Sequence, residues 1–170
     1  MRRTVFVLGG ARSGKSAFAE RLADATGLEQ VYIATGQAFD AEMVARIDAH
    51  RRSRGTGWRT VEAPQALTQA IRAEARQDRV LLVDCLTLWL SNCLLADGDI
   101  AAAIDELGRM LEAADGTIIL VSNEVGLSIV PENALARAFR DHSGRMNQAI
   151  AARADEAWLV AAGLPLKLKG

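Results

Sequence analysis

The feature that most constrains the fold is a segment of eight residues, Gly9-Gly10-Ala11-Arg12-Ser13-Gly14-Lys15-Ser16. It follows the apolar run 5–8, which has the composition of a buried strand, and leads into a helix predicted over 15–25. In that setting glycines let backbone amides approach phosphate closely, and a helix N-terminus favours an anion. Lys15 is placed to reach the β- and γ-phosphates, and the Ser16 hydroxyl to ligate Mg²⁺. The segment therefore predicts a P-loop that binds a nucleoside triphosphate; the alternative is a glycine-rich turn beside a surface lysine.

The remaining chain alternates between strand-like and helix-like patterns. Further strands are predicted over 31–34, 58–61, 79–84, 117–121, 157–161 and 164–168. Further helices are predicted over 40–54, 64–77, 86–95, 100–114 and 133–154. Such alternation is typical of an α/β fold, a mostly parallel sheet with helices on both faces. The length of 170 residues fits one domain over 1–170, and no repeat or linker divides it.

The charge balance and the cysteines limit the class of protein. Twenty basic and 21 acidic residues give a net charge of −1, which provides no overall attraction to nucleic acid or to anionic membranes. No apolar run approaches the length of a membrane span. Cys85 and Cys93 belong to no metal-binding or redox motif, and we interpret them as buried free thiols. We therefore expect a cytoplasmic protein that binds no nucleic acid.

A second carboxylate is expected on the metal side of a P-loop, at the end of another strand. Asp84 directly follows the apolar run 80–83 and fits this position. The alternative is that Asp84 caps the helix predicted from 86, and one side chain can do both. We predict Ser16 and Asp84 as the Mg²⁺ ligands.

A histidine beside several arginines indicates a second chemistry. His50 lies near the end of the helix predicted over 40–54 and precedes Arg51, Arg52 and Arg54. Guanidinium groups form an anion site and favour the neutral imidazole, which is the form that attacks phosphorus. The alternatives are a partly buried structural histidine and a solvated basic helix end. His142, on the helix predicted over 133–154, is interpreted as structural.

The chain resembles the bifunctional adenosylcobinamide kinase/adenosylcobinamide-phosphate guanylyltransferase family of cobalamin synthesis. The most specific block is Asn123-Glu124-Val125-Gly126 followed by Val130-Pro131-Glu132-Asn133, whereas the P-loop itself is shared with many families. The other matching blocks are GGARSGKS, 32–35, 40–43, 45–47 with His50, 58–60 with Glu62, 139–141, 144–145 and 147–148. Together they span essentially the whole chain in one order.

The resemblance implies a RecA-like P-loop NTPase fold, a trimeric assembly and two reactions. ATP or GTP phosphorylates the aminopropanol hydroxyl of adenosylcobinamide. GTP then guanylylates a histidine, and GMP passes to adenosylcobinamide phosphate. The family's guanylylated histidine falls on His50. Its nucleotide contacts fall on Gly9 to Ser16, Ala34, Thr35, Gly36, Arg51, Arg52, Ser53, Arg54, Glu62 and Asp84. Some members carry glutamate where this chain has Asp84, which keeps the carboxylate but shortens its reach.

Several assignments stay open from the residues alone. Glu62 is either a guanine contact or a solvated strand-end charge, and Asn123-Glu124 is either a cobinamide or nucleotide-sensor contact or a polar turn. Arg137, Arg140 and Arg145 either border the corrinoid or form a solvated helix face. Glycines flank residues 36–57, which suggests that this segment is hinged. Two other functions remain as alternatives: a P-loop small-molecule kinase without guanylyl transfer, and a regulatory nucleotide switch.

Overall fold

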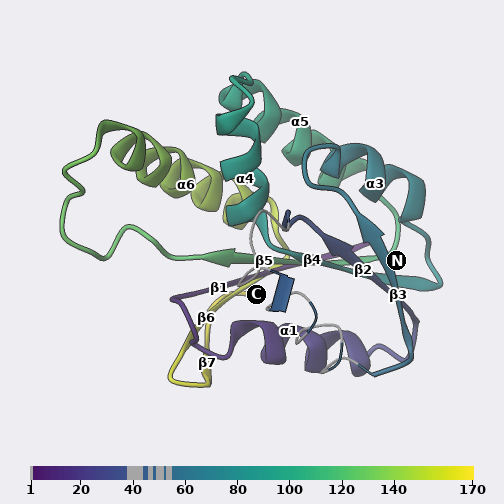
Figure 1. The fold of residues 1–170 in the computed structure, drawn as a ribbon. Helices are drawn as coiled ribbons and strands as arrows, with labels where there is room; N and C mark the ends of the chain where they lie inside the picture. Colours follow the sequence, from purple (N-terminus) through teal and green to yellow (C-terminus); the bar gives the residue numbers. More distant parts are fainter. Residues whose placement is uncertain (1, 38–43, 46–47, 49–51, 53–54) are drawn as a thin grey trace.

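The computed structural model describes residues 2–37, 44–45, 48, 52 and 55–170. A sheet of seven strands in the order β3-β2-β4-β5-β1-β6-β7 forms the centre of the molecule (Figure 1). The strands are β1 (Arg3–Gly9), β2 (Glu29–Ala34), β3 (Trp58–Glu62), β4 (Arg79–Asp84), β5 (Thr117–Asn123), β6 (Glu156–Ala161) and β7 (Leu164–Lys169). All neighbouring strands pair in parallel except β6 and β7, which form an antiparallel hairpin at one edge. The predicted mostly parallel sheet is thus confirmed.

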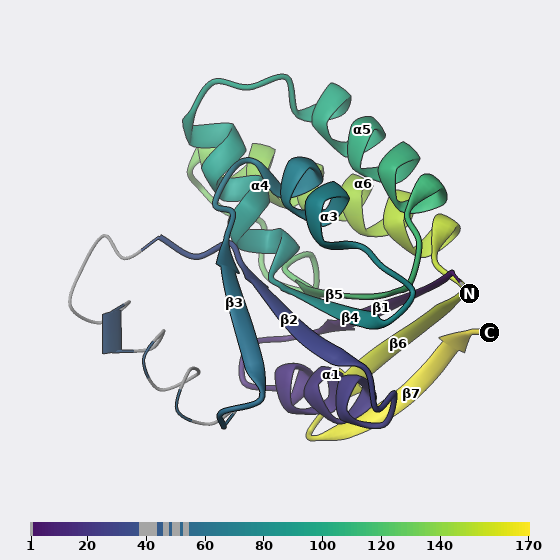
Figure 2. The same cartoon turned by 90° about the vertical axis from the view of Figure 1, so that its right-hand side faces the viewer.

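Helices cover both faces of this sheet. In the described part of the chain, helix α1 (Lys15–Asp24) packs on one face of the sheet and four helices pack on the other (Figures 1 and 2). These are α3 (Leu67–Glu74), α4 (Leu86–Leu95), α5 (Ile100–Ala113) and α6 (Ala134–Arg153). The apolar strand residues alternate between the two layers: Phe6 packs in the core under α3–α6, whereas Val5 and Val7 pack in the core under α1. Strands buried on both faces explain why their sequences are continuous apolar runs.

Helix α3 differs from its prediction. It was expected from Pro64 to 77 but begins at Leu67 and ends at Glu74. The carbonyl oxygens of Pro64 and Gln65 accept hydrogen bonds from Asn92 and Trp89 of α4, so tertiary contacts hold this backbone in a non-helical connection. The helix predicted over 40–54 lies mostly outside the described residues. Within that range the structure describes residues 44, 45, 48 and 52, and all four are helical.

Candidate nucleotide-binding site

The carboxyl ends of the central strands meet at one edge of the sheet. Gly9 of β1 pairs with Asn123 of β5, and Ala34 of β2 pairs with both Asp84 of β4 and Glu62 of β3. This edge is where open α/β sheets bind ligands. The register therefore brings the P-loop, Asp84, the end of β2 and Glu62 together, although they are far apart in the sequence.

The P-loop connects β1 to α1. Arg12 has a φ of 55° and Gly14, the N-cap of α1, has a φ of 90°, so the chain turns through left-handed conformations before the helix begins. Lys15 is 8% exposed, and its ammonium group donates to the Gly10 carbonyl oxygen at 3.1 Å. The lysine charge is therefore held inside the loop, next to the N-terminus of α1, where phosphate binding is favoured.

Asp84 faces the first turn of α1. The Ser16 hydroxyl donates to Asp84 Oδ2 at 3.0 Å. The alternative expected for Asp84, capping α4, does not occur, because the N-cap of α4 is Cys85 and no side chain caps it. A hydroxyl and a carboxylate are hard oxygen ligands, and a P-loop serine with one such carboxylate is a donor set that suits Mg²⁺. Ser16 and Asp84 would hold this ion together with the phosphates.

The other predicted nucleotide contacts are placed unequally. Glu62, the last residue of β3, is exposed at the edge of the sheet where the carboxyl ends of the strands meet, called here the active edge. Thr35 is fully buried just beneath that edge, whereas Ala34 and Gly36 are partly exposed. Arg52 is exposed, and His50, Arg51, Ser53 and Arg54 lie outside the described residues. The structure thus groups the phosphate-side residues and leaves the place of His50 as a prediction.

Two supports of the site were not foreseen from the sequence. The turn of the β6–β7 hairpin lies against the P-loop, where the Gly163 amide donates to the Ser13 carbonyl oxygen at 2.8 Å. Beneath the end of β5, the Ser122 hydroxyl donates to the side-chain oxygen of Asn147, on α6, at 2.7 Å. The backbone N–H of Asn123 donates to the Thr87 hydroxyl oxygen, on α4, at 2.7 Å. The second support had one sequence signal, the polar residues in otherwise apolar segments, whereas the first joins two backbone groups and had none. In both cases the pairing partners are set by the tertiary fold.

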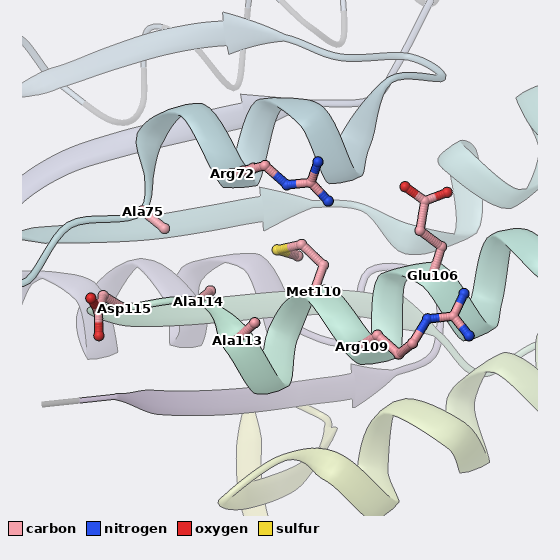
Figure 3. A pocket seen from close by; sticks show the side chains of 8 residues that line it. All are labelled: Arg72, Ala75, Glu106, Arg109, Met110, Ala113, Ala114 and Asp115. Carbon is pink, nitrogen blue, oxygen red and sulfur yellow. The ribbon is translucent and has the colours of Figure 1, made fainter.

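A separate cavity of about 340 Å³ lies between α3 and α5 (Figure 3). Residues of both helices line it, among them Arg72 of α3 and Met110 of α5, together with Asp115 from the segment that follows α5. The carboxyl ends of these helices lead into the amino ends of β4 and β5, so the cavity is at the edge of the sheet opposite the P-loop. It is therefore distinct from the nucleotide site.

The P-loop, its setting between a central strand and a helix, and the parallel sheet define a P-loop NTPase. The fold is similar to that of flagellar accessory protein FlaH from Methanocaldococcus jannaschii, with a TM-score of 0.54 and 14% identity over 98% of this chain and 78% of the other. It is also similar to an ATPase from a bacterial type III secretion system, with a TM-score of 0.54 and 13% identity over 97% and 56% of the two chains. In the described residues, none of the helices is sufficiently long and apolar to cross a membrane.

Comparison of sequences defines the chain more closely. The model of the family described as cobinamide kinase / cobinamide phosphate guanyltransferase matches residues 5–168. The chain is 51% identical to the bifunctional adenosylcobalamin biosynthesis protein CobP of Pseudomonas aeruginosa, over 96% of each chain. It is 46% identical to the bifunctional protein CobU of Salmonella typhimurium, over 97% of this chain and 99% of the other. The chain therefore belongs to this family of bifunctional kinase and guanylyltransferase enzymes of cobalamin biosynthesis, as its motifs predicted.

Proposed function

We propose that both family reactions take place at the single P-loop described above. In the first, ATP or GTP phosphorylates the aminopropanol hydroxyl of adenosylcobinamide. In the second, GMP passes from GTP through His50 to adenosylcobinamide phosphate. The observation that carries this proposal is the convergence of Lys15, the Ser16–Asp84 pair and Glu62 at one sheet edge in a chain of this family.

The kinase reaction uses the phosphate side of the site. The loop amides and Lys15 hold the β- and γ-phosphates in line with the attacking hydroxyl and balance the charge that develops on them. Bound between Ser16, Asp84 and the phosphates, Mg²⁺ would supply further charge neutralisation. The hydroxyl oxygen forms a bond to the γ-phosphorus, the bond to the nucleoside diphosphate breaks, and the hydroxyl proton is released.

The guanylyl reaction uses the same cradle for a different part of GTP. A nitrogen of neutral His50 attacks the α-phosphorus, and pyrophosphate leaves while held by the P-loop and by Arg51, Arg52 and Arg54. A phosphate oxygen of adenosylcobinamide phosphate then attacks the same phosphorus, which breaks the P–N bond and frees the imidazole. Glu62 accepts hydrogen bonds from the guanine N1–H and amino group, which would select GTP over ATP as the guanylyl donor.

We propose that residues 36–57 rearrange between the two steps, so that His50 is presented to the α-phosphate in one and a substrate hydroxyl to the γ-phosphate in the other. Gly55 has a φ of 73°, a conformation that favours glycine, and Gly36 and Gly57 flank the same segment. Crystals of the free and the GTP-bound protein test this; a segment in one and the same position in both would exclude the rearrangement.

The covalent step has a direct test. After incubation with GTP, intact-mass spectrometry should show an adduct of the mass of GMP that is labile in acid and stable in alkali. His50→Ala should lose the adduct while adenosylcobinamide phosphorylation remains measurable, with His142→Ala as the matched control that keeps both. Kinase activity without any adduct in the wild type would favour a small-molecule kinase, and nucleotide-dependent partner binding without turnover would favour a regulatory switch.

We also propose a homo-oligomer, a trimer by family resemblance, acting in the cytoplasm. The connection between β5 and α6 (Figure 1) supports association, because it carries Leu127 and Ile129, which are 90% and 92% exposed. Sedimentation equilibrium measures the assembly directly, and a monomer at micromolar concentration would exclude it.

A further inference from the structure

A buried threonine joins the ends of two strands directly behind the Ser16–Asp84 pair. Thr35 follows β2 and is fully buried. Its hydroxyl accepts a hydrogen bond from the Cys85 amide at 2.8 Å and donates to the Cys85 carbonyl oxygen at 2.7 Å. Its amide also donates to the Asp84 carbonyl oxygen at 3.4 Å. One side chain thus satisfies both backbone polar groups of the residue that follows Asp84.

Thr35 is itself held from the opposite side. The side-chain amide of Asn92, on α4, donates one hydrogen bond to the Thr35 carbonyl oxygen at 2.8 Å and another to the Pro64 carbonyl oxygen at 2.9 Å. Asn92 is only 7% exposed. Buried hydrogen bonds of this kind tolerate little displacement, because a broken bond leaves a polar group without water. Asn92 and Thr35 therefore form a fixed link between α4 and the active edge.

This link fixes the backbone that carries the Asp84 side chain. Asp84 is the last residue of β4, so the sheet holds the backbone before it, and Thr35 holds the backbone of Cys85 after it. With both neighbours held, the carboxylate remains within hydrogen-bonding distance of Ser16. A carboxylate that binds Mg²⁺ through water or directly needs such restraint, because the ion demands near-ideal octahedral geometry.

We infer that Thr35 is a positioning residue: its hydroxyl fixes the Cys85 backbone and thereby aligns Asp84 with Ser16 for the Mg²⁺–nucleotide complex. This inference rests on the proposed role of Ser16 and Asp84 and deepens it. It also gives Thr35 a different role from direct nucleotide contact, since its hydroxyl is fully buried and both donates and accepts a hydrogen bond within the protein.

The experiment compares nucleotide affinity with and without Mg²⁺. The probe is GDP carrying an N-methylanthraniloyl fluorophore on its ribose, titrated with the full-length protein in Mg²⁺ and in EDTA. Thr35→Val removes the hydroxyl with little change in volume, and we expect it to lose at least 10-fold in affinity in Mg²⁺ but less than 2-fold in EDTA. Thr35→Ser retains the hydroxyl and should return to within 3-fold of the wild type in Mg²⁺.

Controls separate positioning from general damage to the fold. Thr117→Val makes the same change at a buried threonine. Thr117 is the first residue of β5, at the strand end opposite the nucleotide site, and its variant should keep the full rise in nucleotide affinity that Mg²⁺ gives. If Thr35→Val does not fold, Thr35→Cys keeps a weak donor of similar size and should show an intermediate loss confined to Mg²⁺.

The outcomes distinguish this inference from the function on which it rests. Three outcomes would overturn the positioning role alone. Thr35→Val could lose equal affinity in Mg²⁺ and in EDTA, or it could keep the full rise in affinity that Mg²⁺ gives the wild type. Thr35→Ser could also fail to restore the affinity in Mg²⁺. A wild-type protein whose affinity does not rise with Mg²⁺ would overturn the Mg²⁺ role of Ser16 and Asp84 and this inference with it.

Discussion

Two adjacent glycines of the P-loop have opposite surroundings and should respond differently to the same substitution. Gly9 is buried at the end of β1, between β5 and β6. A Cβ atom added there would lie 2.6 Å from the Val160 carbonyl oxygen and 2.5 Å from the Ser13 hydroxyl oxygen. Gly10 is exposed, and a Cβ atom there would meet nothing within 4 Å. Gly9→Ala and Gly10→Ala are therefore a matched pair.

The cost of Gly9→Ala follows from which atoms must move. The Ser13 side chain can rotate away, but the Val160 oxygen belongs to β6, whose strand is paired with β1 in this register. Opening the contact to an ordinary carbon–oxygen distance needs a shift of several tenths of an ångström in a strand that is paired on both sides. Overpacking of this kind costs about 1–3 kcal/mol. In a domain of this size each kcal/mol lowers Tm by about 2–4 °C.

Urea and thermal unfolding of the nucleotide-free proteins measure the difference. We expect Gly9→Ala to be destabilised by about 1–3 kcal/mol, and Gly10→Ala, like most exposed substitutions, to stay within about 0.5 kcal/mol of the wild type. Gly10→Ala should weaken only nucleotide binding, where its methyl group meets the phosphates. Equal stability of the two variants would refute the reasoning, because it would mean that β1 and β6 separate without cost.

Two further predictions concern ionisable groups. Hydrogen bonding by Arg59 holds the pKa of Glu74 below its usual range. The stability that ionised Glu74 contributes is therefore fully present above the carboxyl's ordinary pKa of about 4.5, and it is lost as the pH falls through the lowered value. Glu74→Gln should flatten the acid limb of a stability–pH profile, and an unchanged limb would contradict this role. Burial raises the pKa of Cys85 to about 11, so iodoacetamide at pH 8 should modify Cys85 only after unfolding in urea, as peptide mass mapping would show; rapid labelling of the native protein would contradict it.

The architecture could be predicted because its signals are local. Fully apolar runs such as 80–83 and 118–121 indicate strands buried on both faces, and each is followed by a helical pattern. The two strands predicted at the end of the chain, over 157–161 and 164–168, are also present, and the structure shows that they pair antiparallel around a turn at Gly163. The predicted start of α3, Pro64, was wrong by three residues. The contacts that hold residues 64–66 in a non-helical conformation come from α4, and no local pattern encodes them.

The site was predictable in its chemistry and less so in its supports. The spacing of the P-loop motif implies the positions of Lys15 and Ser16, and the strand before Asp84 implies that the carboxylate reaches the same edge. The sequence gives no sign that Thr35 bonds to Cys85 or that Gly163 supports Ser13, because these contacts join segments about 50 and 150 residues apart. The placement of His50 remains a prediction of the family resemblance.

A single P-loop imposes an order on the two proposed reactions. The loop is supported on one side by the β6–β7 turn and on the other by the Asp84 strand end, so in the proposed function the same loop would hold the phosphates of the nucleotide in both reactions. One GTP molecule cannot both transfer its γ-phosphate to a substrate hydroxyl and release that phosphate as part of the pyrophosphate leaving group. The two reactions must therefore use successive nucleotides, and the choice between them depends on which nucleophile is presented: a substrate hydroxyl at the γ-phosphorus or His50 at the α-phosphorus.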